Sequence, residues 1–247
     1  MTEGCYRRTA IAVGALFIIA TASAVASGTI LGNSLDTPDL LLNLSQRGRE
    51  VVFAVVFELM LAASMIGIGS LMFPVLRRQA EGLALGYAGI RLMEAAFVVI
   101  ASISLLVMLT MGEYQAAGGE GGGLQSFGAL LVALREWSYL IGTLVFLGIG
   151  AAILNYILYC SQLIPRWLSV WGFIGALFVL LYGILGLFGT DTNTFDATTL
   201  LAAPLAVQEM ALAVWLIFKG FAEPARSLDH LSSEAQLQQP FIAPGHK

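Results

Sequence analysis

Long runs of residues without a charged side chain recur along this chain of 247 residues. Only 11% of the residues are charged and 58% are hydrophobic, whereas a soluble domain carries roughly a quarter charged residues. A water-soluble fold could not hide so much apolar surface, because its exterior needs polar atoms. The composition therefore excludes a soluble enzyme and a disordered protein, and it predicts a chain that is surrounded by lipid.

Six apolar stretches are long enough to cross about 30 Å of hydrocarbon at about 1.5 Å per residue. They are residues 9–31, 51–76, 83–111, 137–159, 168–189 and 198–218. In lipid each segment must pair its own backbone N–H and C=O groups, so these segments should be helices. We expect an all-α, polytopic six-transmembrane-helix bundle over residues 1–221. The polar, proline-containing residues 222–247 should form a disordered cytoplasmic tail.

The first stretch also resembles a cleavable signal peptide, because small residues follow its apolar run. A signal peptide has an apolar region of about 7–15 residues, and this run is longer, so we expect a retained helix. Orientation follows from the positive charges, which gather on the cytoplasmic side. Eight lysines and arginines lie on one side of the predicted spans and three on the other, which predicts that both termini are in the cytoplasm. The eight are Arg7, Arg8, Arg77, Arg78, Arg166, Lys219, Arg226 and Lys247, against Arg47, Arg49 and Arg135.

Two segments between the spans look amphipathic. Thr37, Pro38 and Asp39 form a helix-start signal ahead of a leucine-rich stretch, which predicts a short helix at the outer interface. After the glycine-rich residues 118–123, apolar residues repeat at helical spacing from Leu124 to Leu134 and lead toward the fourth span. Either segment could cap the bundle, or it could form a lid over an outward-facing pocket.

Four ionisable residues fall inside the predicted spans. A charge near the bilayer centre is costly, so Glu58, Arg91, Glu94 and Glu209 should face the bundle interior and find partners there. Arg91 and Glu94 are three residues apart and share a helix face. Counting from the ends of the spans places Glu94 and Glu209 near the midplane, Arg91 closer to the cytoplasm and Glu58 closer to the outside. If their helices face one another, the four form a ladder across the membrane.

Three carboxylates and one guanidinium in this ladder would sum to −2 if all were ionised. Low dielectric disfavours such an excess, so at least one carboxyl should be protonated at neutral pH. Arg91 is the natural hub, since its fork can hold two carboxylates. Two interpretations stay open: a binding site or proton relay, lined also by Asn155 and Gln208, or buried ion pairs that only fix the packing of the helices.

Several kinds of chemistry lack their usual residues. The two histidines, His230 and His246, both lie in the predicted tail, so no span can supply a haem ligand, a histidine-based zinc site or a Ser–His pair. Neither a phosphate-binding loop nor a Cys-x2-Cys motif occurs. No basic run could neutralise nucleic-acid phosphates. We therefore expect no cofactor, no metal, no nucleic acid and no catalytic residue, and an enzyme is disfavoured.

The fourth and fifth spans resemble a known family. The residues that carry this are Tyr139-Leu-Ile-Gly-Thr-Leu-Val-Phe-Leu-Gly148, Tyr156-Ile-Leu-Tyr-Cys-Ser161 and Leu163-Ile-Pro-Arg-Trp-Leu168, with Pro204 to Glu209 and Trp215 to Gly220 near the end. They are similar to a bacterial membrane family catalogued as domain of unknown function 4386. Where members often have a polar residue before the fourth span, this chain has Arg135-Glu136-Trp137. The resemblance implies a six-helix bacterial inner-membrane protein and no particular activity.

These observations favour a multi-pass protein of the inner (plasma) membrane that binds, senses or transports a small or amphipathic ligand, such as a lipid, through its polar interior. The alternative is a non-catalytic accessory or scaffold subunit, whose ion pairs are structural. Its partners would be the bilayer together with copies of itself or another membrane protein.

Overall fold

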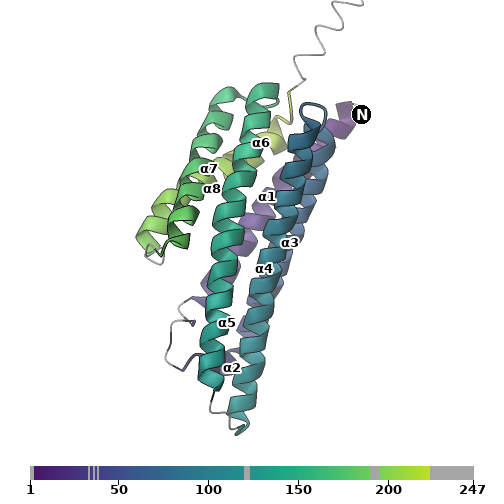
Figure 1. The fold of residues 1–247 in the computed structure, drawn as a ribbon. Coiled ribbons are helices and arrows are strands. Elements are labelled where there is room, and N and C mark those ends of the chain that lie inside the picture. The colour runs from purple at the N-terminus through teal and green to yellow at the C-terminus, as the bar shows by residue number, and fades with distance from the viewer. Residues whose placement is uncertain are drawn as a thin grey trace, which may run out of the picture.

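Every regular element in the computed structural model is a helix (Figure 1). The structure describes residues 3–32, 34–35, 37, 39–119, 123–189 and 195–222, and no strand occurs among them. The predicted all-α class is confirmed. Apart from Ala222, the predicted tail lies outside the described residues, and so do its two histidines.

Five helices are long and apolar enough to cross a membrane, which makes the chain a multi-pass membrane protein. An eighth helix, α8, follows them, and its apolar part, Ala202–Phe218, is shorter. The five are α1 (Glu3–Leu31), α3 (Gly48–Leu76), α4 (Glu81–Ala116), the continuous helix Leu124–Ser161, and α7 (Arg166–Leu187), and α8 spans Phe195–Phe218. Many large apolar side chains point out of the bundle, as lipid-facing helices require.

The continuous helix begins thirteen residues earlier than the span predicted from Trp137. It joins α5 (Leu124–Tyr139), the π-helix η1 (Leu140–Phe146) and α6 (Leu147–Ser161). The amphipathic segment after Leu124 is therefore part of a spanning helix and forms no separate cap or lid. Phe127 and Leu130 are 62% and 65% exposed on its outer side, while Gly128 packs against Leu41.

The short helix predicted in the first loop is present as α2 (Leu40–Gln46). Pro38 of its start signal lies outside the described residues. Leu41 and Leu44 are buried against α3 and α4. Gly112 of α4 leaves no room for a Cβ atom beside the Leu41 carbonyl, so α2 lies directly on α4. Whether α2 lies at the outer interface stays a prediction.

The helices pack as an antiparallel bundle around α1, α3 and α4. α1 lies between α3 and α8, α4 contacts α3, α5 and α6, and α7 contacts α6 and α8. At Gly14 an added Cβ would lie 2.6 Å from the carbonyl oxygen of Ala213, so α1 and α8 need a small residue there. Figure 1 shows α7 and α8 beside the upper part of the bundle, while α5 and α2 lie in its lower part.

The start of α1 and the end of α8 lie at the same end of the bundle (Figure 1). Gly220 approaches Arg7, and the Arg78 guanidinium lies 5.2 Å from the ring centre of Tyr6. The inner-side arginines and lysine predicted from the sequence therefore gather here, as far as the structure describes them. Arg135, which the sequence places among the three outer-side charges, does not fit that prediction. It is 5% exposed inside the bundle and is not an interface charge, because the helix that carries it starts at Leu124.

Candidate functional site

Glu58 in the middle of α3 is held by Arg135 of α5. Glu58 is 1% exposed and Arg135 is 5% exposed. Nη2 of Arg135 donates to Oε1 of Glu58, and Nη1 donates to Oε2 at 3.3 Å and to the Ala101 carbonyl at 2.8 Å. A bidentate arginine–carboxylate pair is both strong and directional. The two charges cancel, so this cluster carries no net charge.

Three hydroxyl groups complete the shell around the Glu58 carboxylate. Ser27 of α1 donates to Oε1 at 3.0 Å, Ser102 of α4 donates to Oε2 at 2.6 Å, and Tyr139 donates to Oε1 at 2.7 Å. Tyr139 stands one turn after Arg135, and its ring centre lies 4.9 Å from the guanidinium. Each carboxylate oxygen thus has several donors, which come from three other helices, and none of the cost of an unpaired buried charge remains.

A cavity of about 290 Å³ opens beside this ion pair. α1 and the residues after it form one wall, and α3 and α5 contribute Glu58, Arg135 and Tyr139. The lining residues are Ala24, Ser27, Gly28, Leu31, Gly32, Leu35, Glu58, Leu61, Arg135 and Tyr139. A mostly apolar cavity with a few convergent polar groups is the usual form of a small-molecule site.

The π-helix η1 follows directly after Tyr139. Its seven residues form wider turns than an α-helix, and such segments frequently mark functional sites. Gly142 allows the close approach of α4, since a Cβ there would lie 2.6 Å from Cβ of Phe97. Phe97 also stacks on Phe146, with ring centres 5.7 Å apart. The wider turns therefore rotate the side chains of α6 relative to those of α5, so that they point in other directions than an uninterrupted α-helix would give.

A second cluster surrounds Arg91 of α4. Nη1 donates to Oε2 of Glu94 at 2.8 Å, Nη2 to Oε1 of Glu209 at 3.4 Å, and Nε to the Tyr87 hydroxyl at 3.1 Å. The guanidinium also lies 5.6 Å from the ring centre of Phe17. The structure thus brings together three of the four ionisable residues predicted to interact. Glu58 is not among them, so the predicted ladder is two separate clusters.

Asn155 and Gln208 form a third polar contact. Nε2 of Gln208 donates to Oδ1 of Asn155 at 3.3 Å and to the Leu168 carbonyl at 3.3 Å, and Nδ2 of Asn155 donates to the Ala151 carbonyl at 2.9 Å. Both residues are buried, and Gly172 leaves no space beside the Asn155 amide. These amides link α6, α7 and α8 and show no hydrogen bond to either arginine.

A family model described as a domain of unknown function (DUF4386) matches residues 12–220. The chain belongs to this family. No curated protein and no solved structure was found to match it.

Sequence reasoning missed Arg135 in this DUF4386 protein, together with the hydroxyl groups of Ser27, Ser102 and Tyr139. In the sequence, Arg135 looks like a topology signal, because the apolar stretch of the fourth span begins only at Trp137. The signal that could have revealed it is the apolar repeat from Leu124 to Leu134, which continues into the span and places Arg135 far from a helix end. Within the described part of the chain, no three His, Cys, Asp or Glu side chains are close enough to hold a metal ion.

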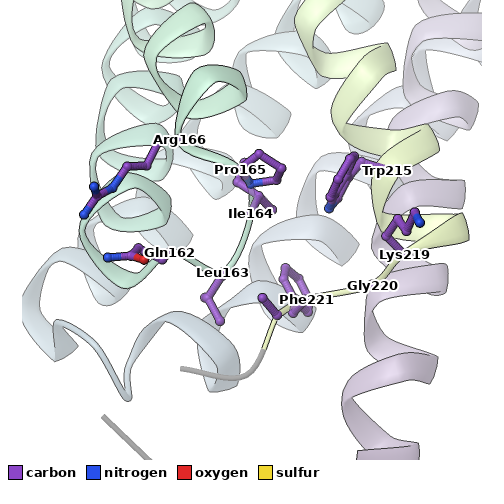
Figure 2. Close-up of a pocket in the computed structure, with 10 residues that line it drawn as sticks. Gln162, Leu163, Ile164, Pro165, Arg166, Trp215, Lys219, Gly220 and Phe221 are labelled. Carbon is purple, nitrogen blue, oxygen red and sulfur yellow. The ribbon is translucent and has the colours of Figure 1, made fainter. Parts of the chain in front are cut away.

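A second cavity, of about 340 Å³, opens between the α6–α7 turn and the end of α8 (Figure 2). Pro165, Trp215 and Phe221 border it. Arg166 points away from Trp215 in Figure 2, and its guanidinium lies 5.6 Å from the ring centre of Tyr159. Arg166 and Lys219 also line this cavity, but none of Glu58, Arg91, Glu94 and Glu209 does. The first cavity is therefore the better candidate site.

Proposed function

We propose that this chain is an integral inner-membrane protein that binds a small or amphipathic ligand in the cavity beside Glu58 and Arg135. The observation that carries the proposal is the position of a buried, bidentate ion pair on the wall of a cavity of about 290 Å³. Charges are retained inside membrane proteins mainly where they serve substrates, ions or packing. Here the two charges border a cavity, whereas an ion pair that only holds helices together would not need open space beside it.

The proposed topology has six spans, with α8 as the sixth, and both termini in the cytoplasm. An even number of spans agrees with the start of α1 and the end of α8, which lie at one end of the bundle (Figure 1). The burial of Arg135 also strengthens the charge asymmetry. Of the three outer arginines, it leaves only Arg47, just before α3, and Arg49, in the first turn of α3, outside the bundle interior. Under the positive-inside rule, the arginine-rich end faces the cytoplasm, and the Glu58 cavity then lies toward the outer side.

A scaffold role is the second candidate, and one observation favours it. The Glu58 carboxylate receives donors from α1, α4 and α5. A helix-locking contact needs such a saturated network, and it would work without any ligand. The two functions differ in whether the cavity is occupied.

Filling the cavity separates these functions. Gly28 lines it, and a Cβ added there meets no atom within 4 Å, so Gly28→Leu should fill space without disturbing the ion pair. Gly89→Leu on α4 is the matched control, because Gly89 also faces open space and lies outside the cavity. Native mass spectrometry of protein released from its membrane into mild detergent should show a bound lipid or metabolite on the wild type and on Gly89→Leu, and its loss from Gly28→Leu.

The ligand-binding proposal fails if the wild-type chain carries no adduct, or if Gly28→Leu keeps it. If the chain is a scaffold, the single chain should carry no adduct in the wild type or in Gly28→Leu, and the substitution should instead change the number of subunits in the assembly. Accessibility gives an independent check. In a background with Cys5→Ser and Cys160→Ser, Ala24→Cys should react with a membrane-impermeant thiol reagent if the cavity is hydrated from outside.

A further inference from the structure

The Arg91 cluster has one positive charge facing two carboxyl groups. Glu94 belongs to the same helix as Arg91, and Glu209 reaches it from α8. Tyr87 of α4 is the other titratable group in contact, and α1 contributes the uncharged ring of Phe17. Gly69 of α3 and Gly150 of α6 complete the wall. Among the described residues, no second cation reaches these carboxyls, so the fully ionised cluster would have a net charge of −1.

One oxygen of Glu94 has no hydrogen-bond partner. Oε2 accepts from Arg91, whereas Oε1 is buried and unpaired, and the Glu94 residue is 0% exposed. A Cβ atom added at Gly150 would lie 3.1 Å from Oε1 and 3.0 Å from Cγ2 of Ile90, so Gly150 packs closely against this oxygen and leaves little space beside it. A buried anionic oxygen without a donor is costly, and neutralisation is the usual outcome.

The missing charge is best supplied by a proton. A sodium ion would need several oxygen ligands, and within the described residues no group of three His, Cys, Asp or Glu side chains could hold a metal ion here. A proton needs no such shell, and it converts the excess carboxylate into a neutral acid. Glu209 offers the way in, because its side chain is 17% exposed whereas that of Glu94 is 1% exposed.

We propose that Arg91, Glu94 and Glu209 form a buried site that holds one exchangeable proton, shared between the two carboxyl groups. Arg91 pairs with whichever carboxyl is ionised. This inference does not depend on the ligand-binding function proposed above, because it involves a different cluster.

The location of the proton decides how α8 is held. α8 packs against α1 and α7, and the Arg91–Glu209 pair is its ionic link to α4. With the proton on Glu94, Arg91 binds Glu209 across the helices. When the proton is on Glu209, Arg91 binds Glu94 within α4 and the link to α8 loses its charge. The site thereby couples protonation to the attachment of α8.

Infrared spectroscopy of the full chain in lipid nanodiscs tests the proposal at neutral pH. A protonated carboxyl gives a C=O band that ionised carboxylates lack. We expect about one such group per folded wild-type chain, since one proton balances the cluster. Glu94→Gln and Glu209→Gln should each abolish the band, because the remaining carboxylate then forms a neutral pair with Arg91. Glu81→Gln, an exposed carboxyl at the start of the same helix, is the control and should leave the band unchanged.

The proposal is overturned if the folded wild type shows no protonated carboxyl, or if the band survives in both glutamine variants. Should the variants fail to fold, the wild type alone still decides. Its band must be present in nanodiscs and must disappear when the protein is unfolded in detergent at the same pH, where exposed carboxyls ionise. A band that persists in the unfolded chain would also contradict the proposal.

Discussion

The two arginine clusters of this protein differ in charge balance and in hydrogen bonding. Arg135 meets one carboxylate, and both oxygens of Glu58 have additional donors. Arg91 meets two carboxyls, and Oε1 of Glu94 has no donor. The balanced cluster lines a cavity, whereas Gly69 and Gly150 pack closely against the unbalanced one. Counting charges and donors therefore separates a fixed ion pair from a site that can exchange a proton.

The largest effect should come from breaking the balanced pair. Arg135→Gln leaves the Glu58 charge without a counter-ion and should lower the free energy of unfolding by about 3–5 kcal/mol. The double variant Glu58→Gln with Arg135→Gln should recover most of this loss, because no buried charge then remains. Reversible unfolding in mixed detergent micelles measures both. If the single and double variants lose the same free energy of unfolding, Arg135 does not neutralise the Glu58 charge as proposed.

A smaller loss is expected at the unbalanced cluster. Arg91→Gln removes the one cation that contacts these carboxyls in the described part of the chain, but Glu94 and Glu209 can both take up protons. The free energy of unfolding should therefore fall by about 1–3 kcal/mol, the cost of unsatisfied polar groups. The same unfolding measurement applies, with the infrared band of protonated carboxyls expected to double. A loss as large as that of Arg135→Gln would remove the difference between the two clusters.

The smallest effect concerns the two tyrosines. Tyr139→Phe removes one of several donors to Glu58, and Tyr87→Phe removes the acceptor for Nε of Arg91. Each should cost about 1 kcal/mol of unfolding free energy. Tyr139→Phe should also alter adduct binding in native mass spectrometry, because Tyr139 lines the cavity and Tyr87 does not. Equal effects of both variants on the adduct would argue against the cavity as the ligand site.

The sequence predicted the helices better than their contacts. Absence of charge over about 20 residues is enough to identify a membrane helix, and the cost of a buried charge identified Glu58, Arg91, Glu94 and Glu209. The spacing of Arg91 and Glu94 on one helix also predicted their contact. These are local properties, which is why they could be inferred without a structure.

Partners on different helices could not be predicted in the same way. Each residue rotates a helix by about 100°, so a small change in phase turns a side chain to another neighbour. The π-helix η1 makes such a change between Arg135 and Asn155, and the apolar pattern of residues 140–146 does not mark it. Arg135 was further obscured because an arginine near a predicted helix end looks like a topology signal. The pairing of Glu58 with Arg135 required the structure.

The helices also differ greatly in length. At about 1.5 Å per residue, the 36 residues of α4 extend over about 54 Å and the 22 residues of α7 over about 33 Å. A hydrocarbon layer of about 30 Å matches α7 and is too thin for α4. α4 must therefore project beyond the hydrocarbon at its polar ends, tilt, or lie where the bilayer is thicker. A tilt or a thicker bilayer would give the protein a preference among membranes of different thickness.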